Sequence, residues 1–183
     1  AIGYRAGFGM TTASGSVLIG YQAGDNITTA SGSVFIGVDA GGNVETGNMN
    51  IGIGYNAFHN AATGDNNIAI GANAGDALTS GYSNVVMGAN AGGALTVGQM
   101  NVAVGTNALL AETMGNSTVA IGEGAGYSQV SDSTNETTGN TIMGTIAGYY
   151  NVTGKNNTYL GYAAGLGTSG YSNSSNVGIG YQA

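Results

Sequence analysis

A glycine that follows an apolar residue recurs at a nearly constant interval, and this interval limits the folds open to the chain. The step is 17 residues seven times, then 22, 17 and 19. The markers are Gly3, Gly20, Gly37, Gly54, Gly71, Gly88, Gly105, Gly122, Gly144, Gly161 and Gly180. A fixed period is the signature of a repeat architecture, in which each repeat packs on the next.

Each position of the repeat forms a column that predicts local structure. The residue before the marker is Ile, Val, Leu or Met in all eleven lines, and the residue two positions earlier is β-branched. This alternation predicts a short strand that ends at the marker. The third residue after the marker is always Ala, which predicts a crowded inside corner. The marker itself is expected to adopt a positive φ or to allow close backbone approach.

These columns predict an all-β fold, a parallel β-solenoid or β-roll of about ten 17-residue rungs. Glycine every few residues is incompatible with helix. Residues 1–183 form one repeat domain, with irregular rungs at 122–144 and 161–180. Because the chain begins and ends within ordinary repeat lines, we expect a segment of a longer fibre or units that stack end to end.

Asparagines occupy two of the columns. Four residues before the marker stand Asn50, Asn67, Asn84 and Asn101, and two after it stand Asn56, Asn73, Asn90 and Asn107. Stacked amides form hydrogen-bonded ladders. A structural ladder is the favoured interpretation, and a polar binding stripe is the alternative.

The middle column of the strand predicts self-association. It carries no charge or amide, and a strand that is apolar on both faces is covered on both faces. We therefore expect an interface between copies of the chain at Leu18, Phe35, Ala69, Val86, Ala103, Ala120 and Ile142.

Composition excludes several functional classes. The net charge is −7 and Arg5 and Lys155 are the only basic residues besides His59, so no basic stripe is available for nucleic acid. No apolar run reaches the roughly 18 residues of a membrane span. A single histidine, no cysteine and scattered acids predict no metal site, no cofactor and no enzymatic activity. The glycine pairs that loosely match a dinucleotide fingerprint are repeat corners.

The two irregular rungs are the candidate contact sites. Insertions in a solenoid project from one face, often the binding face. Aromatic rings and amides are typical of sugar-binding surfaces. We expect contact with a cell-surface glycan or protein receptor at Tyr127, Asn135, Tyr171 and Asn173; the alternative is that these loops merely tolerate insertion.

The segments "NNIAIG", "NVAVG" and "STVAIG", each followed by Ala at the third position, resemble the head repeats of YadA-like trimeric autotransporter adhesins. "IGYQAG" resembles repetitive shafts of phage tail fibres and bacterial surface fibres. The resemblance implies a left-handed roll, a homotrimer, an extracellular or virion location and an adhesive role. The repeat of 17 residues is longer than that of the YadA-type heads.

An ice-binding or other planar-ligand-binding solenoid is the alternative function. Thr11, Thr28, Thr79, Thr96 and Thr113 share one column, as a flat array of hydroxyls requires. Thr46, Thr63 and Thr153 are displaced by one position, which counts against such an array.

Overall fold

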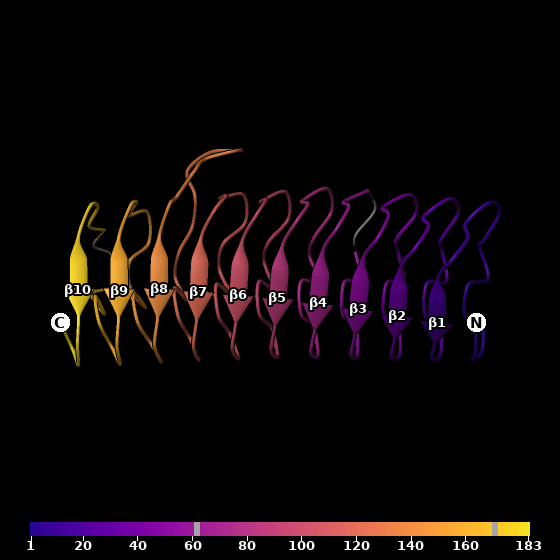
Figure 1. Ribbon diagram of the computed structural model, residues 1–183, viewed down its shortest axis with the longest axis horizontal. Coiled ribbons are helices and arrows are strands. Elements are labelled where there is room, and N and C mark those ends of the chain that lie inside the picture. The colour runs from indigo at the N-terminus through magenta and orange to yellow at the C-terminus, as the bar shows by residue number, and fades with distance from the viewer. Residues whose placement is uncertain (61–62, 170–171) are drawn as a thin grey trace.

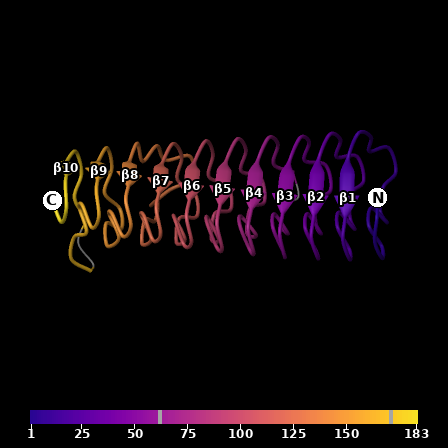
Figure 2. The same cartoon turned by 60° about the horizontal axis from the view of Figure 1, so that its bottom comes forward.

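The computed structural model describes residues 1–60, 63–169 and 172–183, and over these residues the chain is a β-solenoid without helix (Figures 1 and 2). Ten three-residue strands form one parallel sheet in chain order, so the predicted all-β solenoid is confirmed. The strands are β1 (Val17–Ile19), β2 (Val34–Ile36), β3 (Ile51–Ile53), β4 (Ile68–Ile70), β5 (Val85–Met87), β6 (Val102–Val104), β7 (Val119–Ile121), β8 (Thr141–Met143), β9 (Thr158–Leu160) and β10 (Val177–Ile179).

Each rung lies in register with the next. In β1 and β2, for example, Leu18 pairs with Phe35. The turns are paired as well as the strands: the amide of Gly24 donates to the carbonyl of Ala40 at 2.9 Å, and Gly41 donates to Ala57 at 3.0 Å. Backbone hydrogen bonds therefore run along the rod on several sides of each rung, at the roughly 4.8 Å spacing of neighbouring strands.

Both expected roles of the marker glycine are confirmed. All eleven markers have φ between 124° and 141°. A Cβ added to Gly37 would also lie 2.3 Å from the carbonyl oxygen of Gly54 in the next rung. A side chain at this position would therefore break both the local conformation and the contact between rungs.

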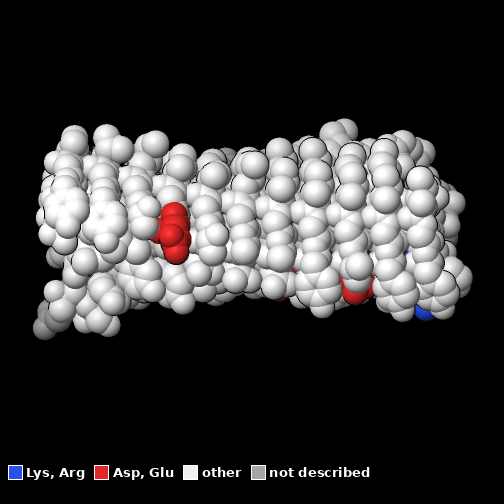
Figure 3. All heavy atoms as spheres, turned by 90° about the horizontal axis from the view of Figure 1, so that it is seen from below, with Lys and Arg blue, Asp and Glu red and all other residues white. Residues whose placement is uncertain are grey.

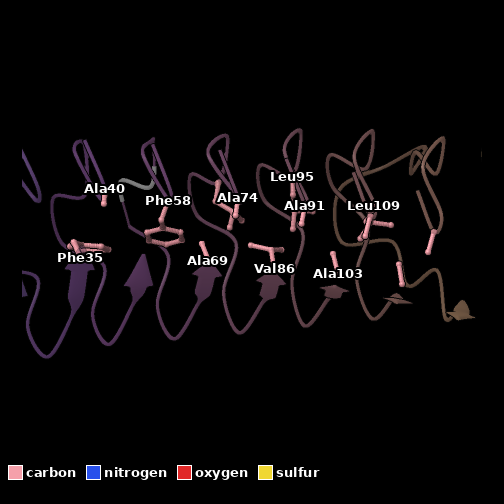
Figure 4. Packing of buried hydrophobic residues seen from close by; sticks show 14 of the residues in the cluster. Phe35, Ala40, Phe58, Ala69, Ala74, Val86, Ala91, Leu95, Ala103 and Leu109 are labelled. Atoms are coloured by element: carbon pink, nitrogen blue, oxygen red, sulfur yellow. The ribbon is translucent and has the colours of Figure 1, made fainter. Parts of the chain in front are cut away.

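The interior of each rung is one side chain wide. The middle residue of the strand meets the corner Ala from the opposite wall, as Val86 and Ala91 do in Figure 4. Ala74, Ala91 and Ala108 are fully buried, which confirms the predicted corner. A third column adds Ile27, Val44, Leu78 and Leu95.

The prediction that the middle column of the strand faces another chain is wrong, because these side chains point into the core of their own chain. The seven residues expected to meet another chain have at most 1% of their surface exposed in the single chain, and Figure 4 shows Phe35, Ala69, Val86 and Ala103 pointing into the rung. They are Leu18, Phe35, Ala69, Val86, Ala103, Ala120 and Ile142. The interior of a 17-residue rung is narrow enough for one residue per strand, so the flanking residues turn outward.

Two positions of each rung share one space in the core: the middle residue of the strand and the fourth residue after the marker. When one of them is glycine, the other can hold the larger side chain. Most rungs place a larger residue in the strand and glycine four residues after the marker, as with Phe35 and Gly41. The third rung reverses this, with Gly52 in the strand and Phe58 buried at the second position. Phe58 has φ 57° and stacks on Phe35, with ring centroids 6.2 Å apart. Close packing therefore outweighs the cost of a left-handed bulky residue.

The first asparagine column forms a buried ladder, as the favoured interpretation predicted. The side-chain oxygen of Asn67 accepts from the backbone amide of Asn84 at 2.9 Å and from its side-chain nitrogen at 3.0 Å. The side-chain nitrogen of Asn84 also donates to the carbonyl of Gly98 at 2.8 Å. Each side-chain amide in the ladder thus forms hydrogen bonds with the asparagine of the neighbouring rung and with a buried backbone carbonyl.

A buried carboxylate anchors the irregular rung. Glu112 replaces the aliphatic residue of the third core column and is fully buried. One carboxylate oxygen accepts from the backbone amides of Thr113, Gly115 and Ser131 at 2.9, 2.8 and 3.1 Å. The other oxygen accepts from the Ser131 hydroxyl at 3.1 Å. These donors compensate the loss of water around the charge and hold the start of the insertion against the rod.

We expect Asn84→Ala to lower the free energy of unfolding by about 2–5 kcal/mol, because the carbonyl of Gly98 and the amide of Asn101 lose buried partners. Denaturant titration measures this loss. The control is Asn26→Ala, whose exposed side chain bonds only to Asn43 and whose effect should stay within about 0.5 kcal/mol. Equal effects of the two substitutions would contradict a buried structural ladder.

Exchange of core volume predicts a rescue. Phe58→Gly should destabilise the rod by about 3–5 kcal/mol through a cavity, and Gly52→Leu alone should overpack it by about 1–3 kcal/mol. The double variant restores the arrangement of the neighbouring rungs and should be more stable than Phe58→Gly. Strictly additive losses in the double-mutant cycle would show that the two positions do not share one space.

Candidate functional site

The outer face of the sheet is an extended, mainly apolar surface of the rod. Both residues that flank the buried strand position are uncharged on every strand, and many are well exposed. Val17 and Leu160 are each 45% exposed, and Met87 is 37% exposed. Seen from below, the adjoining face shows acidic groups at a few points and a basic group near one end (Figure 3). Extended apolar surfaces are typical of interaction sites, so this face is a candidate.

Tyrosines extend this surface near both ends of the rod. Tyr4 and Tyr21, each one residue after a marker, stack with ring centroids 5.3 Å apart. Tyr162 and Tyr181 stack at the same distance in the last two rungs. All four rings are at least 47% exposed, so they offer flat apolar faces to a partner.

An open pocket with aromatic walls, called the aromatic cavity below, lies in the turns that follow β8 and β9. Its volume is about 290 Å³ and it is lined by Ile146, Tyr149, Tyr150 and Leu166. Tyr149 stacks on Tyr127 with centroids 4.6 Å apart and planes 9° apart, and it meets Tyr150 edge-on at 4.9 Å. Desolvation raises the pKa of Tyr149, with smaller contributions from the charges of Tyr127 and Tyr150, so its phenol stays neutral near pH 7.

Backbone strain is located at this cavity. Ile146 has φ 52°, a conformation that β-branched residues rarely adopt. The same position holds Asn73, Asn90 and Asn107 in earlier rungs, and asparagine tolerates it. The preceding rung has Gly124 there, and a Cβ on Gly124 would lie 3.2 Å from the ring of Tyr149. The chain thus departs from its repeat where the aromatic rings gather.

The structure does not bring the four predicted contact residues together. Tyr127 joins the aromatic cluster, whereas the side-chain oxygen of Asn135 accepts from Gln99 at 3.2 Å. The backbone amide of Asn173 donates to the side-chain oxygen of Asn151 at 3.2 Å. Tyr171 lies outside the described residues. Sequence reasoning missed Ile146, Tyr149, Tyr150 and Leu166, although Tyr127 and Tyr149 occupy the same column in adjacent rungs.

The first insertion projects from the rod between β7 and β8 (Figure 1). Glu136 of this insertion forms an ion pair with Lys155, which lies in the next rung, a regular one of 17 residues. The side chain of Glu136 also accepts a hydrogen bond from the backbone amide of Asp132 at 2.9 Å. The hydrogen bond from Lys155 and then that from Asp132 hold the pKa of Glu136 below its usual value. The insertion is therefore an ordered loop tied to the rod by charge.

The threonine column uses its hydroxyls within the rod. The hydroxyls of Thr28 and Thr79 donate to backbone carbonyls of the next rung at 3.0 and 3.2 Å, and that of Thr96 does so at 3.0 Å. Glu45, Val130 and Val152 interrupt the column. The hydroxyl protons of these three residues are therefore not directed outward at an ice surface, as an ice-binding face would require.

Over residues 1–60, 63–169 and 172–183, no group of three His, Cys, Asp or Glu side chains is placed to hold a metal ion. Within the same described chain, no helix is long and apolar enough to cross a membrane. Comparison with known proteins finds no match to a family model, to a curated protein or to a solved structure.

The ion pair on the first insertion predicts a measurable titration. A lowered pKa for Glu136 means that its stabilising contacts are present above the ordinary glutamate pKa of about 4.3 and are lost as pH falls through the lower folded value. The amide NMR shift of Asp132 should therefore titrate below about pH 4.3. Lys155→Met should raise that midpoint. An unchanged midpoint in the variant would contradict the assigned cause.

Proposed function

We propose that this protein is a structural and adhesive fibre segment, a stiff rod in an extracellular or virion filament that assembles through the outer face of its sheet. The single observation that carries the proposal is the pair of uncharged columns on that face from β1 to β10, which are apolar except at Thr141 and Thr158 and are half-buried or exposed in the single chain. A parallel strand that is apolar on both faces is normally covered on both. Self-association is therefore still expected, through the two flanking columns and not through the buried middle column.

The geometry of the face supports a second copy of the chain as its partner. Ten strands at about 4.8 Å, each three residues long at about 3.3 Å per residue, give a plane of roughly 480 Å². The exposed tyrosines that follow the markers, such as Tyr21, Tyr55 and Tyr162, widen it towards the roughly 800 Å² per partner of a standard interface. The face repeats every rung, and an identical rod carries the same repeat along its whole length.

The proposed number of copies and the proposed adhesive role are supported by the sequence resemblance and not by the geometry of this face. Three copies follow from the resemblance to trimeric adhesin heads, as do the extracellular or virion location and a glycan or protein receptor. The proposal is for a non-catalytic protein. Ice binding is the weaker alternative because the threonine hydroxyls named above are engaged within the rod. Thermal hysteresis in cold solution would favour that alternative.

Assembly through the outer face is tested with Met87→Glu, which places a charge on a side chain that is exposed in the single chain. The chain mass is 17.9 kDa. Light scattering should give three times this mass for the wild type and a single chain for the variant, because burying an unpaired carboxylate at an interface is costly. The circular dichroism spectrum should not change, since a single chain leaves this side chain in water.

The matched control is Ser80→Glu, which adds the same charge at an exposed position away from the strands. This variant should keep the wild-type mass. A wild type that runs as a monomer would overturn self-association, and a Met87→Glu variant that remains fully assembled would overturn the assignment of this face. Rods of uniform width in negatively stained images support the fibre role, and globular particles contradict it.

A further inference from the structure

We propose that the cavity lined by Ile146, Tyr149, Tyr150 and Leu166 binds a neutral pyranose ring of a surface glycan. This inference rests on the adhesive part of the proposed function and assigns it a site that the sequence did not predict. It differs from the predicted contact set because Asn135 and Asn173 make their contacts elsewhere.

Three departures from the repeat occur together at this place. A left-handed isoleucine stands where four earlier rungs have asparagine and the first three have Arg, Gln or Asp, and glycine stands at the same position one rung before it. Two tyrosines on adjacent rungs then stack above the space that Gly124 leaves open. Strained residues persist where surrounding structure holds them, and such positions cluster at binding sites. No packing need in the core explains the strain, because Ile146 is only partly buried.

The lining suits a ring with one apolar face. Tyr149 is held by its stack on Tyr127 and by the edge contact with Tyr150, so little side-chain freedom is lost when a ligand binds. Leu166 follows Tyr149 in the same column of the next rung, and the amide of Tyr150 donates to its carbonyl at 3.0 Å. The C–H face of a pyranose presents the flat, apolar surface that such a wall accepts.

Charge and polar groups select the class of ligand. The four lining residues carry no charge, which favours a neutral sugar over an acidic one. The phenols of Tyr149 and Tyr150 can each donate and accept a hydrogen bond, as sugar hydroxyls require. A volume of about 290 Å³ lies just below the range of about 300–1,000 Å³ that is usual for small-molecule sites, and it suits one ring with its substituents rather than an extended chain.

Saturation-transfer NMR on the intact chain tests the proposal, with the methyl glycosides of glucose, galactose, mannose and N-acetylglucosamine as probes at millimolar concentration. At least one glycoside should receive saturation, strongest at the C–H protons of one ring face. Tyr149→Leu should weaken that binding roughly three- to tenfold, because the aromatic face is lost. Tyr149→Phe should weaken it less, because the ring remains. Tyr82→Leu, at an exposed tyrosine on a distant rung, should leave it unchanged.

Ile146→Asn separates binding from folding. It restores the residue of the earlier rungs, so the thermal midpoint should rise by about 2–4 °C while glycoside binding weakens. A loss of binding with a lower midpoint in every cavity variant would indicate damage to the fold and overturn the assignment.

Two further results would overturn the proposal: no saturation transfer to any of the four glycosides, or binding of a hydrophobic dye at this cavity without glycoside binding. Neither result changes the mass measured for the assembly. Failure of this site is therefore distinguishable from failure of the proposed self-association.

Discussion

The structure depends on the hydrogen bonds that connect each rung to the next in register. Because strands and turns both take part, a residue lies directly over its equivalent in the following rung. Every column must therefore tolerate contact with copies of itself at about 4.8 Å. Alanine corners, amide ladders and glycine contacts meet this condition, and a column of like charges would not.

A narrow interior follows from the same stacking. With one strand residue per rung inside, a missing side chain leaves a gap that only the same or the next rung can fill. Phe58 fills the space beside Gly52 in this way, and Leu109 is buried beside Ala103. Where the interior becomes polar, at Glu112, the charge is surrounded by backbone amides and a hydroxyl. The rod thus stays closely packed and hydrogen-bonded although its rungs differ.

The proposed assembly and the proposed ligand binding use different parts of this rod. The outer strand face is regular from rung to rung, which suits a partner that is equally regular. The aromatic cavity is formed where the repeat is broken, by Ile146 and the three tyrosines around it. The proposed self-association therefore uses the regular columns, whereas the proposed ligand site uses side chains that occur together once in the described part of the chain.

The sequence by itself determined the period, the strand positions, the buried alanine corner and the asparagine ladder, because each is a column that repeats. It did not determine which side of the strand faces inward. Alternation has a period of two, and because all three strand positions are uncharged and mostly apolar, both directions fit the pattern. Only the closed shape of the rung, with room for one side chain such as Val86, decided the direction. The cavity likewise needed the tertiary structure, since stacking brings Tyr127 beside Tyr149 across the 22-residue step.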